Sequence, residues 1–205
     1  MNLEIYFMRY FHKIMKIPIK IIQVETKGKL KNVVILHSSD YFELKGDSTE
    51  KIKEFEKLYS DTVDKIKKIF YGSDVKEKKY QNLPSSMYFE LGCILQKFDQ
   101  KADNEFEIKN YNNSISRDFG LSKDYIYDLI TIADLFKKKE ILDSVPFSYY
   151  RALKRKRKDL ESLGLFENEK KRLNKMGKND KLPGREQYKV ELIQIIDSKN
   201  EEKQK

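Results

Sequence analysis

The chain is poor in the residues from which most metal, redox and covalent catalytic sites are built. It contains one cysteine, Cys93, so neither a disulfide framework nor a cysteine-based zinc site can form within one chain. The two histidines, His12 and His37, lie far apart, and no glycine-rich phosphate-binding loop is present. We therefore expect no enzyme activity, no metal and no cofactor, and we expect Cys93 to be a small buried residue in a reducing compartment.

Long hydrophobic segments are also missing. Residues 1–22 are largely apolar, but four basic residues interrupt them: Arg9, Lys13, Lys16 and Lys20. A membrane-spanning helix needs about 20 consecutive apolar residues, and a secretory signal needs an unbroken apolar core followed by a small-residue cleavage site. The sequence therefore predicts no membrane association and a cytoplasmic location.

Positive charge, in contrast, is in excess. Lysine and arginine number 42 against 33 aspartates and glutamates, which leaves a formal net charge of +9. A charge of this size favours anionic partners such as nucleic acid or a membrane surface, although a lysine-rich composition alone produces the same excess. The 12 phenylalanines and 13 tyrosines supply core material, so the composition is that of a folded protein.

The N-terminal third predicts a small β-α module. Residues 17–25 and 30–37 are rich in β-branched side chains and enclose the turn sequence TKGK, so they predict a β-hairpin, to which 41–44 are expected to add a strand. A helix that ends at Gly72 is expected next. Its apolar residues recur at helical spacing: Ile52, Phe55, Tyr59, Val63, Ile66 and Phe70. We expect this module, residues 1–72, to pair two protomers.

The remainder of the chain predicts only helices. A polar segment with a proline, 71–86, indicates a boundary. A helical domain over 84–197 and a flexible tail at 198–205 are expected after it. Helices are predicted near 86–98, 106–118, 122–136, 148–163, 167–176 and 185–197. The expected fold class is therefore α+β, a β-hairpin/α module followed by an all-helical domain.

The segment SISRDFGLSKDYIYDLI, residues 114–130, predicts a helix-turn-helix within the helical domain. Gly120 tolerates the left-handed backbone that ends a first helix, and Ser122 can cap a second helix that begins at Lys123. Apolar residues precede the turn and lie along one face of the second helix: Ile115, Phe119, Ile126, Leu129, Ile130 and Ala133. The spacing therefore predicts two helices that pack across a turn at Gly120.

This pattern resembles the helix-turn-helix of ParB-type and related prokaryotic DNA-binding proteins. There, a glycine at the turn is followed by a small hydroxyl residue and then by an apolar pair on the recognition helix, as at Gly120, Ser122, Ile126 and Leu129. The segments YFELGCILQKF and VPFSYYRALKRKRKDLE are more loosely similar to a prokaryotic winged-helix family that often accompanies nuclease domains. The resemblance implies binding to double-stranded DNA.

The outer face of the second helix carries two aspartates, which repel phosphate. Asp124, Tyr127, Asp128 and Thr131 form this face, which lacks the Arg, Asn and Gln that usually bond to guanine and adenine. Asp128 can accept a hydrogen bond from cytosine, and Tyr127 and Thr131 can contact phosphate or a thymine methyl group. The residues expected to face DNA are Ser122, Lys123, Tyr127, Asp128 and Thr131, and a solvated helix face is the alternative interpretation.

The strongest basic cluster is YYRALKRKRKDLESLG, residues 149–164. If this segment is one helix, four cations lie within about 100° of one another on its surface: Arg151, Lys154, Arg155 and Lys158. Such a stripe binds phosphates and adds affinity without sequence information. The segment EKKRLNKMGKNDK extends the positive region with Lys170, Lys171, Arg172 and Lys175, and a solvated face is again the alternative.

These features predict an intracellular protein that binds double-stranded DNA as a homodimer, of a regulatory or plasmid or mobile-element maintenance type. The alternative is a helical protein–protein interaction module that does not bind DNA. A metal-dependent nuclease is a third hypothesis, because ETK at 25–27 and ELK at 43–45 have an acid–x–lysine spacing, with Asp40 nearby. A chain this rich in charge contains such triplets by chance.

Overall fold

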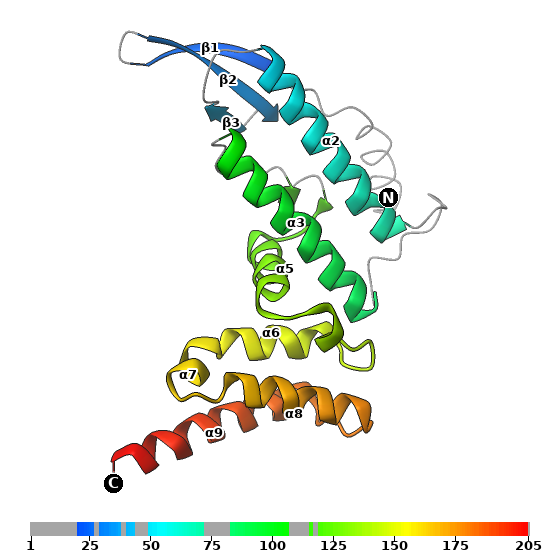
Figure 1. Cartoon of the computed structure of the whole chain (residues 1–205), viewed down its shortest axis with the longest axis vertical. Helices are drawn as coiled ribbons and strands as arrows, with labels where there is room; N and C mark the ends of the chain where they lie inside the picture. The colour runs from blue at the N-terminus through cyan, green and yellow to red at the C-terminus, as the bar shows by residue number, and fades with distance from the viewer. Residues whose placement is uncertain are drawn as a thin grey trace, which may run out of the picture. The chain divides into compact units, whose positions relative to one another are not determined.

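The computed structural model describes residues 20–26, 29–37, 40–43, 49–71, 83–106, 115–116 and 119–204. The first of these segments form three strands in the order β1 (Lys20–Thr26), β2 (Lys29–His37) and β3 (Asp40–Glu43) (Figure 1). Both neighbouring pairs are antiparallel, with Lys20 opposite Ile35 and Val33 opposite Glu43. The many β-branched residues of β1 and β2 favour extended backbone.

Helices follow from Thr49 onward. They are α2 (Thr49–Tyr71), α3 (Ser85–Phe106), α5 (Lys123–Leu135), the short 3-10 helix η1 (Lys138–Glu140), α6 (Phe147–Arg155), α7 (Arg157–Ser162), α8 (Phe166–Lys178) and α9 (Arg185–Gln204). The predicted helix at 106–118 lies mostly outside the described residues. On α2 the residues predicted for the apolar face are buried wherever their side chains are described: Phe55, Tyr59, Val63, Ile66 and Phe70.

The predicted fold class, α+β, is wrong. From Thr49 to Gln204 the described chain contains helices and no strand. The buried side chains of the described core, from Phe55 to Ile196, all belong to helices or to the turns between them. The long aromatic-rich helices come after the strands in the sequence, and their apolar faces form the core by packing on one another. The class supported by the described core is therefore helical.

The chain divides into two compact units whose limits differ from the predicted modules. Unit 1 comprises Met1–Asp64 and Lys97–Ile126, and unit 2 comprises Lys65–Gln96 and Tyr127–Lys205. The divisions fall within α2, α3 and α5, because segments that are distant in sequence pack together in each unit. Helix α9 continues to Gln204 and so includes most of the segment that was predicted to be a flexible tail.

In unit 1 an aromatic cluster joins α2 to the C-terminal half of α3. The ring centroid of Phe55 lies 6.1 Å from that of Phe98 and 5.3 Å from that of Phe106. The ring of Tyr59 lies 5.7 Å from Phe98, edge to face. All four rings are buried, and aromatic pairs in tilted or edge-to-face contact add to the free energy gained from burial alone. Helix α2 therefore shares a core with α3.

In unit 2 the N-terminal half of α3 packs closely on α5. A Cβ atom on Gly92 would lie 2.4 Å from the carbonyl oxygen of Leu129, so the two helices approach this closely only because residue 92 has no side chain. The start of α3 is held by the segment before α6. The Ser85 hydroxyl donates to the Val145 carbonyl at 2.5 Å, and the Ser86 amide donates to the Asp143 carboxylate at 2.8 Å.

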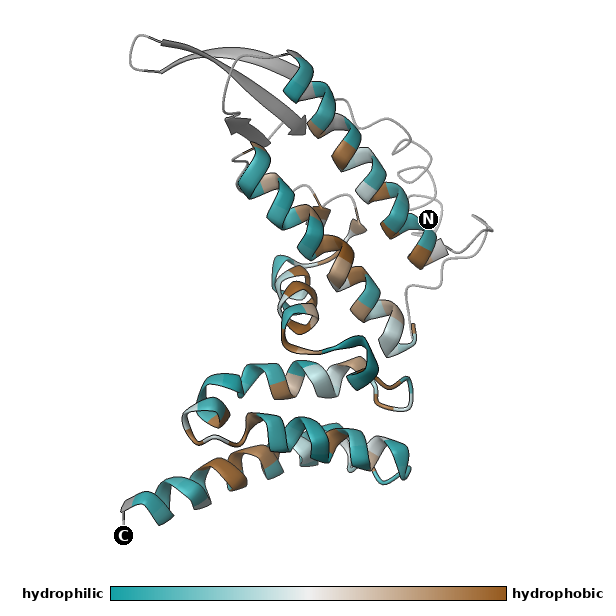
Figure 2. Cartoon of the chain, in the orientation of Figure 1, coloured by the Kyte–Doolittle hydropathy of each residue, from teal (hydrophilic) through white to brown (hydrophobic). Residues whose placement is uncertain are grey.

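Helices α6 and α9 are also in contact within unit 2. The rings of Tyr149 and Tyr188 lie 5.4 Å apart, and the Tyr149 hydroxyl donates to the carbonyl of Pro183, just before α9. Tyr188, Leu192 and Ile196 recur every four residues and are buried, which defines the inner face of α9. Figure 2 shows the hydrophobic middle of this helix in brown.

The helix predicted at 148–163 is broken at Lys156. This residue has φ −97° and ψ 8°, and its amide bonds to the carbonyl of Leu153, three residues earlier, so α6 ends and α7 begins in a new direction. The prediction that Arg151, Lys154, Arg155 and Lys158 share one face of a single helix is therefore wrong: Lys158 belongs to α7.

Candidate nucleic-acid interface

The turn before α5 has the predicted local structure. Gly120 has a φ of +64°, which glycine adopts without strain. The Ser122 hydroxyl accepts a hydrogen bond from the Tyr125 amide at 3.2 Å and so caps the start of α5. Ile115 and Phe119 are buried, as predicted. The predicted turn at Gly120 and cap at Ser122 are therefore confirmed, while most of the first helix of the predicted motif lies outside the described residues.

Helix α5 exposes less of its surface than predicted. Lys123, Asp124 and Tyr127 are exposed, and Thr131 is half-buried, with its hydroxyl donating to the carbonyl of Tyr127 at 2.8 Å. Asp128, however, is only 5% exposed. The prediction that Asp128 lies on an outer face and reads a base is therefore wrong, because cations of α6 surround its carboxylate.

The carboxylate of Asp128 binds three cations of α6. One oxygen accepts a hydrogen bond from Nε of Arg151 at 2.7 Å, and the other accepts one from Nζ of Lys154 at 3.0 Å. A nitrogen of the Arg155 guanidinium lies 3.9 Å away, too far for a direct hydrogen bond. Nζ of Lys154 also lies 4.6 Å from the centre of the Tyr127 ring, within cation–π range.

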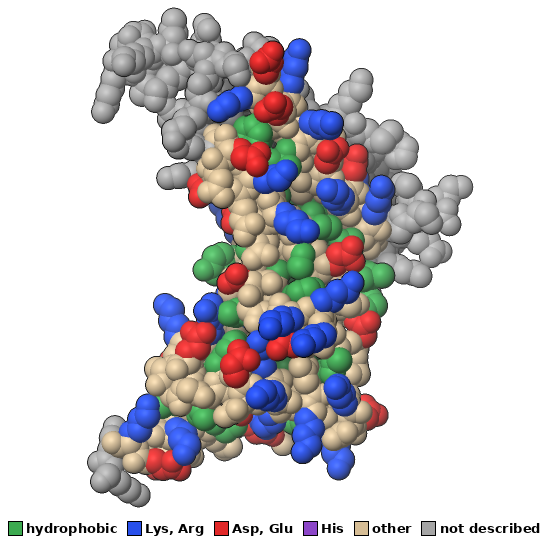
Figure 3. Space-filling model, in the orientation of Figure 1, with side chains coloured by type: hydrophobic (Ala, Val, Ile, Leu, Met, Phe, Trp, Pro, Cys, Tyr) green, Lys and Arg blue, Asp and Glu red, His purple; other side chains and the backbone are tan. Residues whose placement is uncertain are grey.

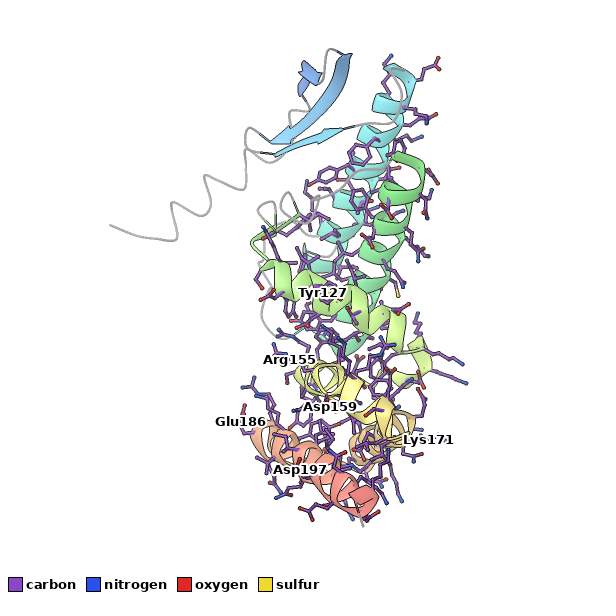
Figure 4. The ribbon with its side chains drawn as sticks, turned by 90° about the vertical axis from the view of Figure 1, so that its left-hand side faces the viewer. Tyr127, Arg155, Asp159, Lys171, Glu186 and Asp197 are labelled. Atoms are coloured by element: carbon purple, nitrogen blue, oxygen red, sulfur yellow. The ribbon has the colours of Figure 1, made fainter. Side chains whose placement is uncertain are left out.

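These contacts divide the α6 cations into two kinds. The side chains of Arg151 and Lys154 are 27% and 16% exposed, whereas that of Arg155 is 60% exposed. Three positive charges surround one negative charge, so the cluster keeps two in excess. Because Arg151 and Lys154 bind Asp128 directly, the excess is most accessible to a solution anion at Arg155, which Figure 4 shows beside the ribbon of α6.

The basic residues at Lys156 and on α7 differ in whether an acidic side chain pairs with them. Lys156 lies 3.9 Å from Asp159, and Arg157 donates to Glu161 at 2.7 Å. Lys158 is exposed and has no ion-pair partner among the described residues. Figure 3 shows lysine and arginine side chains over these helices with acidic side chains between them. Arg155 and Lys158 are thus the cations of α6 and α7 that are most available to phosphate.

The second basic segment, on α8, contains the same two kinds of cation. Nζ of Lys170 is buried and lies 3.3 Å from Glu140 and 3.2 Å from Glu167. Arg172 donates to Glu169 at 2.7 Å and to Glu191 at 3.0 Å. Burial lowers the pKa of Arg172, but these two hydrogen bonds outweigh it and raise the pKa. Lys170 and Arg172 therefore contribute to packing, whereas Lys171 and Lys175 are exposed.

The role of Asp128 as the centre of the α6 cluster was not predicted. Its partners, Arg151 and Lys154, lie 23 and 26 positions later in the sequence. Residue spacing over such a distance does not predict a side-chain contact. One local signal was present: Asp128 precedes the buried Ile132 by four residues, so helical geometry places it at the edge of the buried face.

Other sites have little support in the described part of the chain. There, no group of three or more His, Cys, Asp and Glu side chains could hold a metal ion, and no described helix is long and apolar enough to cross a membrane. The side chains of the acid–x–lysine triplets at 25–27 and 43–45, and that of Asp40, lie outside the described set. No protein-family model, no curated protein and no solved structure matches this chain.

Proposed function

We propose that this chain binds the phosphate backbone of double-stranded DNA through α6 and α7. The observation that carries the proposal is the exposure of Arg155 and Lys158 beside a cluster that retains two positive charges after Asp128 is counted. Asp128 binds Arg151 and Lys154 of α6 directly, so the helix that carries Arg155 is anchored to α5. The helix-turn-helix resemblance around Gly120 supports the same class of partner.

The exposed residues of α5 favour backbone contact over base recognition. Lys123 and Tyr127 can contact phosphate, but the exposed face carries no Arg, Asn or Gln. Those residues make the commonest specific contacts in the major groove. The affinity of the protein for DNA therefore depends on charge. In this proposal the protein acts as a homodimer in regulation or in plasmid or mobile-element maintenance.

Fluorescence anisotropy with a random-sequence duplex over a salt series tests this proposal. Replacing Arg155 and Lys158 by Gln should flatten the log–log salt dependence by about 1.8, because each phosphate contact contributes about 0.9. The matched control replaces Arg185 and Lys189, which both pair with Glu186, and should change the slope less. A slope that is the same in the Arg155/Lys158 variant and the wild type would rule out this surface.

A second candidate function, protein–protein interaction, is favoured by one observation. Val190 and Ile193, three residues apart on α9, are large apolar side chains that remain exposed, as at many interfaces. Sedimentation velocity of the wild type and of a Val190→Ser/Ile193→Ser variant tests it. Self-association that disappears in the variant, together with no binding to any duplex, would favour this function over DNA binding.

A further inference from the structure

Helix α8 carries a row of lysines on its outer face. Lys171, Lys175 and Lys178 recur at positions i, i+4 and i+7 and are all exposed, so they lie within about 60° of one another around the helix. At 1.5 Å of rise per residue the row is about 10 Å long. One strand of duplex DNA presents a phosphate about every 3.4 Å along its axis, so several phosphates lie within reach of the three long lysine side chains.

The acidic side chains of α8 do not neutralise this row. Glu169 pairs with Arg172 on the side of the helix that packs against the protein. Glu167 is exposed beside Lys171, but its carboxylate pairs with Lys170 rather than with the row. Within the described residues none of the three outer lysines has an ion-pair partner. The helix therefore presents three adjacent positive charges on that face, and the one acid there, Glu167, is already paired with Lys170.

The character of this face favours a phosphate backbone over a membrane or a protein partner. The apolar residues of α8, among them Phe166 and Leu173, are buried in the protein. None of the large exposed hydrophobic side chains of the described chain lies on α8. A helix that binds a membrane surface inserts an exposed apolar face, and a protein interface centres on buried aromatic or apolar residues. Neither feature is present here.

The row is separate from the surface of α6 and α7. In Figure 4 the labelled side chains of Arg155 and Lys171 lie on opposite sides of the helices of unit 2. The α8 cations next to Lys171 in the sequence, Lys170 and Arg172, are engaged by Glu140, Glu169 and Glu191, so they do not extend the row.

We propose that the lysine row of α8 is a second face that binds duplex DNA, so that one chain holds two DNA segments at once. The inference rests on the proposed function, because it assigns the same class of partner to a second surface. Two contact faces on one chain allow it to join two duplexes or two distant parts of one duplex, which a single face does not.

Native mass spectrometry with a duplex of about 10 base pairs, one helical turn, tests the proposal by counting duplexes per chain. Counting per chain makes the result independent of dimerisation, and so short a duplex cannot reach both faces. The wild type should bind two duplexes per chain. The Lys171→Gln/Lys175→Gln/Lys178→Gln variant should bind one, and its salt slope in the anisotropy assay should flatten by about 2.7.

The matched control removes three positive charges elsewhere, at Arg185, Lys189 and Lys199, each of which pairs with a glutamate. It should still bind two duplexes per chain, and circular dichroism should show all variants folded. Two duplexes on the α8 variant, or one on the wild type that is lost only when Arg155 and Lys158 are replaced, would overturn the inference. One duplex on the wild type that is lost only in the α8 variant would overturn both the two-duplex inference and the α6–α7 proposal, and would leave α8 as the DNA-binding surface.

Discussion

Helices α6 and α8 are both basic, but their inner cations are held in different ways. In α6, Arg151 and Lys154 bind one carboxylate, Asp128, which comes from α5. In α8, the inner cations each bind two carboxylates, one from the same helix and one from elsewhere: Lys170 binds Glu167 and Glu140, and Arg172 binds Glu169 and Glu191. The inner charges of α8 are therefore balanced by acids, whereas those of α6 outnumber their single acid.

The difference shows why a count of basic residues overstates the charge offered to a partner. An inner cation that donates to a buried carboxylate stabilises packing, and a competing phosphate must first displace that carboxylate. An outer cation such as Arg155 or Lys175 loses only its hydration. On both helices, basic residues that are neighbours in the sequence differ in role: some are inner cations paired with carboxylates, and others are outer cations exposed to water.

The strongest test of the α6 arrangement is Asp128→Asn. The substitution leaves Arg151 and Lys154 without a buried counter-charge, and we expect it to lower the free energy of unfolding by about 3 kcal/mol. Urea denaturation followed by circular dichroism measures the change. The control is Asp124→Asn, an exposed acid on the same helix, which should cost less than about 1 kcal/mol. Equal effects of the two substitutions would contradict the role assigned to Asp128.

A matched pair on α6 separates stability from binding. Arg151→Gln and Arg155→Gln remove the same charge one helical turn apart. We expect the first to lower the free energy of unfolding by about 2 kcal/mol, since it breaks a charge-assisted hydrogen bond. The second should cost less than about 0.5 kcal/mol, because its contact is long and exposed.

Binding of the same two variants should show the opposite order. Anisotropy with a random duplex should give a larger loss of affinity for Arg155→Gln than for Arg151→Gln, because Arg155 is the more exposed. If Arg151→Gln weakened DNA binding more without destabilising the fold, the division into inner and outer cations on α6 would be incorrect.

Beneath α8, Tyr188 offers a test with a pH signature. Its hydroxyl is buried without a hydrogen-bond partner among the described residues, and burial raises its pKa. The unfolded chain therefore ionises this tyrosine first, so stability is lost as the pH rises above about 10. Tyr188→Phe should raise the free energy of unfolding by about 1 kcal/mol at neutral pH.

Measurements at alkaline pH distinguish the effect of the raised Tyr188 pKa from a simple packing effect of the substitution. In thermal melts between pH 9 and pH 11, the fall in melting temperature with pH should be shallower for Tyr188→Phe than for the wild type. Equal slopes would mean that Tyr188 does not ionise with a raised pKa.

The smallest expected effect concerns Tyr127. Its ring lies under Nζ of Lys154 at 4.6 Å and is exposed to solvent. Tyr127→Leu should therefore cost only about 0.5 kcal/mol. A double-mutant cycle with Lys154→Gln in urea denaturation isolates the coupling between the two side chains, and a coupling of zero would show that the contact adds nothing to the α5–α6 interface.

Local features of the fold were predictable because they depend on neighbours in sequence. The apolar spacing of Phe55 to Phe70 defined the buried face of α2, and the sequence around Gly120 and Ser122 predicted a left-handed turn and a helix cap. Each of these rests on hydrogen bonds or on side-chain directions within a few residues. Such features hold in almost any tertiary setting.

Other features were decided by tertiary packing. The break at Lys156 lies in a segment whose composition favours an unbroken helix, and it moves Lys158 off α6. The fold class was wrong because the described core forms between helices, which the strand-like N-terminal sequence did not indicate. The limits of the two units likewise follow from α2 packing on α3, through rings such as Phe55 and Phe98.

The sequence by itself determined where most of the helices lie, which of their residues are apolar, and that the chain carries a net positive charge. Tertiary structure alone decided which charges face outward. Local geometry places Asp128 only at the edge of the buried face of α5, and the approach of α6 buries it against Arg151 and Lys154. A charge is neutralised by whatever lies within a few ångströms, and that distance is set by packing between residues far apart in the chain.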